Sequence, residues 1–174
     1  TVLLTAAGSD CAVLLGQWAR QAGAEAVYGI HRSPVHAQRL AEKGIVPIAQ
    51  HDMAAVNAAA ARADVVYDAT GGSLAETILS VMPETGTFVC YGLLSGQTFR
   101  QQRPLPCVAW FHIRNYLDAL SAEAWQAEFR RIWPKLRASQ CSDVTLYPLS
   151  EWQRAVGNYR EAGRTGKPML SMDN

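Results

Sequence analysis

Short apolar runs alternate with helix-like patterns along the first two thirds of the chain, and small or turn-forming residues separate them. Continuous apolar runs of this length are typical of strands buried on both faces of a parallel sheet. We therefore predict six strands, at the start of the chain and at residues 26–30, 45–49, 65–69, 87–91 and 105–111. Strands that alternate with helices at this spacing indicate an α/β fold, a doubly wound Rossmann parallel sheet in the order 3-2-1-4-5-6.

Start and stop signals bracket the helices between these strands. The first helix is expected to continue through residues 13–19. Ser33 as N-cap, Pro34 in the first turn and Gly44 just past the end predict the second. An alanine-rich stretch predicts a third helix over 53–62.

Two pairs of polar residues have the spacing of a helix cap, Ser73 with Glu76 and Ser150 with Gln153. The first pair predicts a helix that ends at Met82, before Pro83. The second predicts a helix that ends near Gly163.

The character of the sequence changes after residue 117. We predict a helix at 121–133, a strand at 144–147, the capped helix and a closing strand at 167–172. The chain is therefore expected to consist of a nucleotide-binding Rossmann domain, 1–117, and a C-terminal helix-strand-helix-strand segment, 118–174.

The first turn carries the candidate chemistry. A strand, a turn of small residues and a helix form the crossover that binds a dinucleotide pyrophosphate, because small side chains let phosphates approach the backbone N–H groups at the helix start. Here Ala6-x-x-Ser9-x-x-Ala12 replaces the usual G-x-G-x-x-G. A plain βα unit explains the turn almost as well. Asp10 is a further difficulty, because a like charge near the pyrophosphate costs about 1 kcal/mol or more of binding free energy unless the side chain turns to solvent or caps the helix.

The end of the second strand indicates the cofactor. An NAD-binding domain usually places Asp or Glu there to bind the ribose 2′-hydroxyl. This chain has His31, Arg32 and Ser33. A guanidinium binds the 2′-phosphate of NADP in bidentate fashion and a serine adds a donor, so NADP(H) is the expected cofactor. The alternative is that Arg32 is a solvated residue at a strand end.

Composition excludes several classes of protein. The net charge is +1 with scattered charges, which argues against a nucleic-acid surface, and no apolar stretch is long enough for a membrane span. No signal peptide is recognisable, so a cytoplasmic location is expected. The four cysteines lack C-x-x-C spacing and are predicted to be mostly buried free thiols, with no metal site. Because the chain begins at a core strand without an initiator methionine, we expect a piece of a longer protein.

Several segments together resemble the zinc-independent quinone oxidoreductase and enoyl reductase branch of the medium-chain dehydrogenase/reductase superfamily. The likeness spans essentially the whole chain. The segments are Thr5-Ala6-Ala7-Gly8-Ser9, Gln17-Trp18-Ala19-Arg20, Asp68-Ala69-Thr70-Gly71-Gly72, 86–92, 111–117 and Gly166-Lys167-Pro168-Met169-Leu170. The resemblance implies that the C-terminal segment returns to an N-terminal GroES-like catalytic domain that this chain lacks.

The resemblance also implies which residues contact the cofactor. Those at the pyrophosphate are Ala7, Ser9, Asp10, Cys11 and Ala12, and those at the 2′-phosphate are His31, Arg32, Ser33, His36 and His51. Those that follow the ribose and nicotinamide are Ala69, Thr70, Gly71, Tyr91, Gly92 and Leu93, with Phe111, His112 and Arg114 at the nicotinamide edge.

Several side chains at or near this site have a structural explanation beside the functional one. Asp68 either binds ribose or satisfies a neighbouring turn. His112 either polarises a substrate carbonyl or is a hydrogen-bonded structural histidine. Arg114 either binds an anionic group of the cofactor or substrate, or forms a structural ion pair within the protein. Trp110, Phe111 and Tyr116 form a pocket wall or a dimer seam. The tryptophans at helical spacing are expected to be packing residues, namely Trp18, Trp125, Trp133 and Trp152.

We predict the NADP(H)-binding portion of an oxidoreductase that transfers a hydride to a quinone or an activated alkene. No catalytic residue is assigned, because Y-x-x-x-K, G-x-S-x-G, H-E-x-x-H and Walker motifs are absent from the sequence. A non-catalytic nucleotide-sensing module is the main alternative, and Arg32 argues against a methyltransferase. The sixth strand is expected at an open sheet edge, where a homodimer forms.

Overall fold

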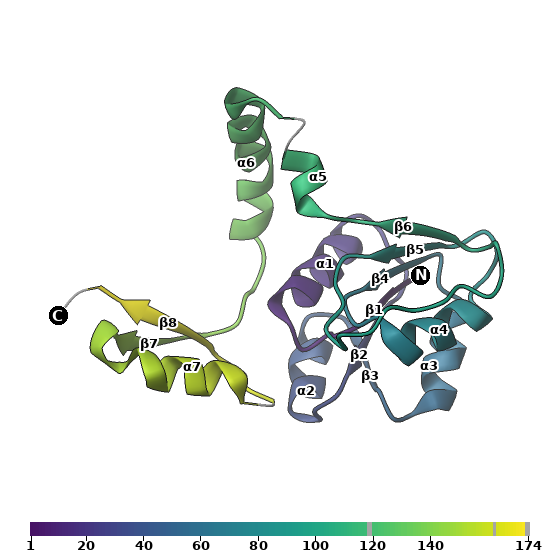
Figure 1. The fold of residues 1–174 in the computed structure, drawn as a ribbon, viewed down its shortest axis with the longest axis horizontal. Helices are drawn as coiled ribbons and strands as arrows, with labels where there is room; N and C mark the ends of the chain where they lie inside the picture. Colours follow the sequence, from purple (N-terminus) through teal and green to yellow (C-terminus); the bar gives the residue numbers. More distant parts are fainter. Residues whose placement is uncertain (118–119, 162, 173–174) are drawn as a thin grey trace.

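The computed structural model describes residues 1–117, 120–161 and 163–172, and its main body is one six-stranded parallel sheet (Figure 1). The strand order is β3-β2-β1-β4-β5-β6, as the sequence predicts. The strands are β1 (Val2–Leu4), β2 (Val27–His31), β3 (Val46–Ala49), β4 (Val65–Asp68), β5 (Thr87–Cys90) and β6 (Cys107–Trp110).

The strand order reverses beside β1, and this reversal determines where a ligand can lie. β1 pairs with both β2 and β4, so that Leu4 is opposite Gly29 on one side and Tyr67 on the other. The connections that leave β1 and β4 run to opposite sides at this point, which leaves a crevice beyond the carboxyl ends of these two strands. Candidate ligand-binding residues should therefore gather there.

Helices cover both faces of the sheet. They are α1 (Asp10–Gln21), α2 (Val35–Glu42), α3 (Met53–Ala60) and α4 (Gly72–Val81). On one face, residues of α1 and α2 such as Val13 and Leu40 pack with Leu4 and Val27. On the other, residues of α3 and α4 such as Val56 and Ile78 belong to a cluster around the fully buried Phe88. The side chains alternate along β4 and β5, because successive residues of a strand point to opposite faces.

The C-terminal segment has the predicted helix-strand-helix-strand order and lies beside the main sheet (Figure 1). Its elements follow the short α5 (Ile113–Leu117) and are α6 (Ala122–Arg137), β7 (Val144–Pro148), the 3-10 turn η1 (Leu149–Glu151), α7 (Trp152–Arg160) and β8 (Lys167–Ser171). β7 and β8 form a separate two-stranded parallel sheet. Gln17 on α1 exchanges two hydrogen bonds with the backbone of Gln140, which ties this segment to the main body.

Three predicted helix caps are wrong. The N-cap of α2 is Pro34 rather than Ser33, and it makes no side-chain cap bond. Ser73 lies inside α4, whose N-cap is Gly71, and no capping box forms. The 3-10 turn holds Ser150, so the N-cap of α7 is Glu151.

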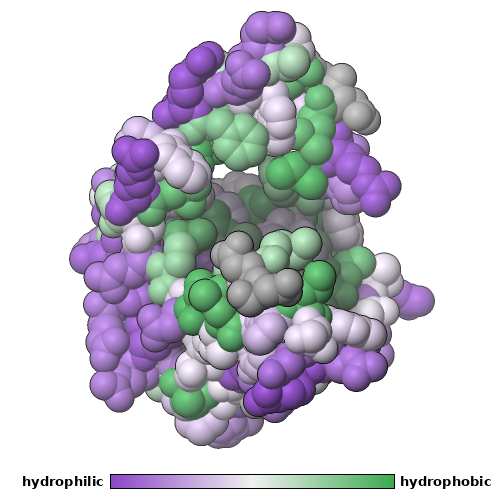
Figure 2. All heavy atoms as spheres, turned by 90° about the vertical axis from the view of Figure 1, so that its left-hand side faces the viewer, coloured by the Kyte–Doolittle hydropathy of each residue, from purple (hydrophilic) through white to green (hydrophobic). Residues whose placement is uncertain are grey.

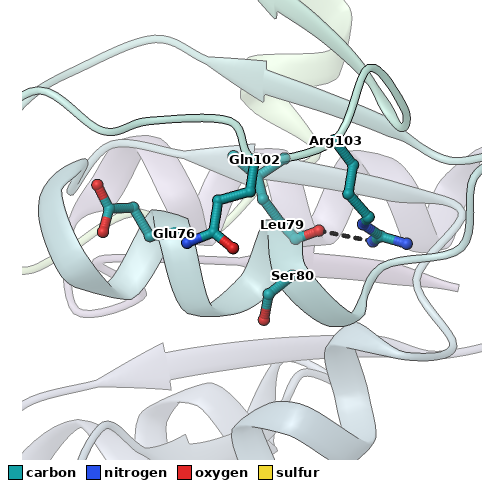
Figure 3. A pocket seen from close by; sticks show the side chains of 5 residues that line it. All are labelled: Glu76, Leu79, Ser80, Gln102 and Arg103. Atoms are coloured by element: carbon teal, nitrogen blue, oxygen red, sulfur yellow. Dashed lines mark hydrogen bonds between the residues drawn. The ribbon is translucent and has the colours of Figure 1, made fainter.

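The loop between β5 and β6 explains why Glu76 does not cap α4. The Glu76 carboxylate accepts a hydrogen bond of 2.9 Å from the backbone N–H of Arg100 in that loop. Arg103 of the same loop donates to the carbonyl of Leu79 on α4 at 2.9 Å (Figure 3). It also donates to the carbonyl of Met82, just after the helix, at 3.1 Å. The small pocket seen in Figure 3 is therefore a junction that fixes the loop on the helix.

The expectation that the cysteines are mostly buried is also wrong, and two of the tryptophans are only partly packed. Three of the four free cysteines, Cys11, Cys107 and Cys141, are exposed, and Cys90 alone is buried. Trp133 on α6 and Trp152 on α7 are both about half exposed. No described residue of α6 is buried, and Ala155 alone is buried in α7. Figure 2 shows hydrophobic side chains around a hollow on this side of the molecule. In the described part of the chain no helix is long and apolar enough to cross a membrane.

Candidate functional site: the carboxyl edge at the strand-order reversal

The turn between β1 and α1 presents backbone N–H groups at the sheet edge. Ser9 is the N-cap of α1, and its hydroxyl accepts a hydrogen bond of 3.3 Å from the N–H of Ala12. Ala6 has a φ of +47°, which small residues tolerate best, and Ala7 is fully buried. The amides of Asp10 and Cys11 are in the first helical turn, where N–H groups have no partner inside a helix. An anion at this helix start would be stabilised by those groups and by the helix dipole.

Asp10 is neither turned to solvent nor capping the helix. Its carboxylate accepts a hydrogen bond from Arg39 on α2 at 2.9 Å, and two from Ser142, one from the N–H at 3.1 Å and one from the hydroxyl. Partial burial raises the pKa of Asp10, but the bonds from Ser142 and Arg39 outweigh it and the net pKa is lowered. The acid in the turn is therefore ionised and paired with a cation.

The end of β2 is rich in groups that can carry positive charge. His31 is buried, Ser33 is half-buried, and Arg32 is exposed, with no hydrogen bond or ion pair to any described residue. On α2 the buried His36 packs against the first turn, because a Cβ placed on Gly8 would lie 2.6 Å from its Cδ2 atom. His51 is exposed just after β3.

The loop before β8 reaches the same place. A Cβ placed on Gly163 would lie only 2.9 Å from the Ser33 hydroxyl, so the two backbones approach closely. The pKa of His36 is lowered, first by burial and then by Arg39, His31 and Arg164. Arg164 is thus a further cation near His36, contributed from more than 100 residues away in the sequence.

Asp68 is a structural residue. It is fully buried and accepts hydrogen bonds from the Thr5 hydroxyl (2.6 Å) and from the N–H groups of Thr70 (3.0 Å) and Gly71 (2.9 Å). Thr5 in turn accepts from the N–H of Ala69 at 2.9 Å. This arrangement joins the ends of β1 and β4 and favours the turn explanation over ribose binding.

The residues after β4 and β5 lie side by side. Leu94 and Ser95 donate backbone hydrogen bonds to Ala69 (2.8 Å) and Thr70 (2.9 Å). Gly92 allows this approach, since a Cβ there would lie 3.1 Å from the Ala69 carbonyl oxygen. The predicted residues Ala69, Thr70, Gly71, Tyr91, Gly92 and Leu93 therefore form one continuous stretch of the edge.

Tyr91 links this stretch to the first turn. Burial raises the pKa of its hydroxyl, and the neighbouring Cys11 thiol and Asp68 carboxylate raise it further. Partial desolvation also raises the pKa of the Cys11 thiol, so this thiol is not an activated nucleophile. Tyr91 is therefore a protonated hydroxyl beside the start of α1.

The residues that follow β6 are exposed. His112 accepts a hydrogen bond of 3.2 Å at Nδ1 from the N–H of Arg114, which makes it a local cap of α5. The side chains of Phe111 and Arg114 are exposed, and the Arg114 guanidinium makes no hydrogen bond or ion pair with the described residues. Trp110 stacks on Phe99 with ring centroids 5.1 Å apart.

The structure thus places the candidate residues along the carboxyl edge from β3 to β6, but sequence reasoning missed four of its members. Arg39 was detectable in principle, because it is one helical turn beyond His36. Thr5, Ser142 and Arg164 had no local signal, since their partners lie 63 or more residues away or in a different element.

The sheet order and this turn define a Rossmann-type α/β domain. A family model described as zinc-binding dehydrogenase matches residues 12–133. The chain therefore belongs to the zinc-binding dehydrogenase family, within the medium-chain dehydrogenase/reductase superfamily. No curated protein sequence matches the chain.

Solved structures share the fold. A Bacillus thuringiensis protein with the provisional description NADPH:quinone reductase has a TM-score of 0.83 and 24% identity, over 98% of this chain and 55% of that one. CurK enoyl reductase has a TM-score of 0.75 and 22% identity over 98% and 54%. Escherichia coli quinone oxidoreductase complexed with NADPH has a TM-score of 0.76 and 19% identity over 97% and 56%. The chain spans about half the length of these proteins.

Zinc, which the family's description implies, does not fit the residues present. Within residues 1–117, 120–161 and 163–172, no group of three or more His, Cys, Asp or Glu side chains is arranged to hold a metal ion. We therefore derive no step through zinc.

Proposed function

We propose that this chain is the NADP(H)-binding portion of an oxidoreductase that transfers a hydride from NADPH to a quinone or to an activated alkene such as an enone or enoyl thioester. The observation that carries the proposal is the cationic end of β2, with Arg32 unpaired, next to an α1 start whose own acid, Asp10, is paired with Arg39. The NADPH in the Escherichia coli quinone oxidoreductase structure, which has the same fold, supports the same cofactor here.

The residues present fit this cofactor. The N–H groups of the first turn of α1 would bind the pyrophosphate, and Arg32 with Ser33 would bind the 2′-phosphate. A carboxylate that would repel this phosphate is absent from residues 31–36. When bound, the cofactor supplies the hydride, and the protein supplies orientation.

The chain's own residues position the reacting end of the site. The Thr5–Asp68 hydrogen bonds hold the loop after β4, and that loop holds the one after β5. Tyr91 and Leu93 would face the nicotinamide side of this edge. The buried Tyr91 hydroxyl, whose pKa is raised, would keep its proton and act as a hydrogen-bond donor.

The remaining chemistry belongs to parts of a longer protein. We propose that residues 118–174 return to an N-terminal GroES-like catalytic domain, which contributes the acid for the quinol or enolate oxygen. The half-exposed Trp133 and Trp152 support this, because such apolar faces are ordinarily covered. We also propose a homodimer through β6, since this strand lies at the edge of the sheet with its outer side unpaired.

Calorimetric titration of the chain with NADPH and NADH tests the proposal. We expect NADPH to bind at least tenfold more tightly than NADH, because a charge-assisted bidentate contact contributes about 1.5–3 kcal/mol. Arg32→Ala should remove most of this preference and leave NADH binding unchanged. Arg130→Ala on the exposed side of α6 is the matched control. Equal binding of the two cofactors by the unsubstituted chain would contradict the assignment of NADP(H).

A further inference from the structure

The connection from α6 to β7, residues 138–143, passes beside α1 (Figure 1) and is called the linker below. Gln17 in the second half of α1 exchanges two hydrogen bonds with the backbone of Gln140 in the linker. Two residues further on, Ser142 donates hydrogen bonds to Asp10 at the start of the same helix. The linker therefore joins the C-terminal segment to the turn where a phosphate is expected.

Asp10 has a charge of the same sign as that phosphate and stands beside its expected place. It is the first residue of α1, directly after the N-cap Ser9. The N–H groups of a first helical turn have no partner inside the helix and attract any negative charge, a carboxylate included. Short acidic side chains bond readily to such nearby backbone groups. A released Asp10 carboxylate would therefore compete with the phosphate for these groups and repel it as well.

Two partners on other elements hold the Asp10 carboxylate. Its Oδ1 atom accepts hydrogen bonds from Arg39 (2.9 Å), from the N–H of Ser142 (3.1 Å) and from the Ser142 hydroxyl. Arg39 lies on α2, which packs on the main sheet through the buried Leu40. Ser142 lies in the linker, and among the described residues from 120 onward Ala155 alone is buried. Ser142 is therefore the partner that can detach while the main body stays folded.

We propose that Ser142 is a positioning residue for the cofactor, which keeps the Asp10 carboxylate off the start of α1 and so couples attachment of the linker to binding of the pyrophosphate. The inference rests on the proposed function, because it concerns a cofactor phosphate at this turn. It goes further by making the C-terminal segment part of the cofactor site. Coupling between two sites is reciprocal, so cofactor binding should strengthen the attachment of the linker by the same factor.

Ser142→Ala removes the hydroxyl that bonds to Asp10. We expect NADPH to bind this variant about three- to tenfold more weakly, the range for the loss of one part-exposed hydrogen bond. The affinity for adenosine 2′-monophosphate, which carries no phosphate at this turn, should not fall. Ser142→Thr retains a hydroxyl and should retain the affinity for NADPH. Calorimetry measures each affinity, and thermal unfolding checks that each variant is folded.

A second substitution at Asp10 distinguishes this role from a merely structural one. If Ser142 acts through the Asp10 carboxylate, Ser142→Ala should weaken NADPH binding less than about twofold in an Asp10→Ala background. Damage to the turn by any other route would lower the affinity equally in both backgrounds. Ser139→Ala is the matched control, because it removes the 2.9 Å bond from the Trp18 indole to the same linker and leaves Asp10 paired. It should change the NADPH affinity less than about twofold.

Hydrogen exchange of the linker amides measures the reciprocal effect. The N–H groups of Gln140 and Ser142 donate to Gln17 and Asp10, so their exchange reports detachment of the linker. Saturating NADPH should slow this exchange at least about threefold, the lower limit of the coupling factor expected above. In Asp10→Ala the slowing should disappear.

The outcomes separate this inference from the proposed function. Unchanged NADPH affinity in Ser142→Ala, or an equal loss in both Asp10 backgrounds, overturns the role of Ser142 and leaves the NADP(H) proposal standing. An equal loss of affinity for adenosine 2′-monophosphate, or linker exchange that NADPH does not slow, overturns it in the same way. Failure of the unsubstituted chain to bind NADPH overturns the nucleotide site and this inference together.

Discussion

Asp10 stands in the turn where a phosphate is expected, and its pairing explains how the site tolerates it. We predict that Asp10→Ala lowers the free energy of unfolding by about 1 kcal/mol at pH 7, because the bonds to Arg39 and Ser142 are only partly shielded from solvent. The folded-state pKa is lowered, so this contribution is complete above the unfolded pKa of about 4 and is lost as the pH falls through the folded-state value.

Urea unfolding at pH 7 and at about pH 2.5 measures this difference. Asp143→Ala is the control, since that exposed carboxylate makes no hydrogen bond with the described residues. An Asp10→Ala effect of the same size at both pH values would show that the ion pair is not its source.

Position 8 has no room for a residue larger than glycine, because the His36 ring lies against it. Its φ is not in the left-handed region, so an alanine there is strained by the His36 ring and not by the backbone. We expect Gly8→Ala to cost about 1–3 kcal/mol of stability. In a His36→Ala background the same change should cost less than about 0.5 kcal/mol. Additive effects in this double-mutant cycle, measured by denaturant unfolding, would contradict the contact.

Single residues of the site differed in how far the sequence could predict them. Arg32 and Ser33 could be proposed from the sequence because their distance from the first turn has a meaning within one βαβ unit. Arg39 and Ser142 were missed because they act on Asp10 from other elements, with Ser142 132 residues away. Asp68 could not be assigned from sequence, since its buried partners depend on how β1 meets β4.

The ends of β1 and β4 are held together by the hydrogen bonds between Thr5, Asp68 and the loop that follows. We predict that Asp68→Ala destabilises the fold by about 3–5 kcal/mol, because it leaves buried donors without partners. Asp52→Ala removes a single exposed cap bond on α3 and should cost only about 1 kcal/mol. Similar losses in the two variants, measured by denaturant unfolding, would show that the buried arrangement adds nothing.

Strands were predicted more successfully than helix ends. All six strands of the main sheet lie where the apolar runs indicate, because burial on both faces leaves a continuous signal. The caps at Ser33, Ser73 and Ser150 were wrong: Pro34 is the N-cap of α2, Glu76 bonds to the loop after β5, and Ser150 lies in a 3-10 turn. Helix α6 continues past Pro134 to Arg137, although proline would ordinarily end it.

The exposed edge of β6 allows the whole molecule to pair with a second copy. We predict a concentration-dependent dimer in analytical ultracentrifugation. Ala109→Lys should weaken it at least tenfold, because a lysine on an edge strand opposes pairing and Ala109 is exposed in the single chain. Gln102→Lys, in the loop before β6, is the control and should leave the dimer intact. A dimer unaffected by Ala109→Lys would place the interface elsewhere.

The most direct test of the account is an NMR titration of the chain with NADPH, following backbone amides. If the cofactor binds across the carboxyl edge at the strand-order reversal, the largest shifts should fall on residues 7–12, 31–33 and 69–71, with NADH sparing Arg32 and Ser33. The far ends of the same strands, at residues 1–2 and 63–65, should shift least. Shifts concentrated on the exposed faces of α6 and α7, or none at saturating NADPH, would contradict the account.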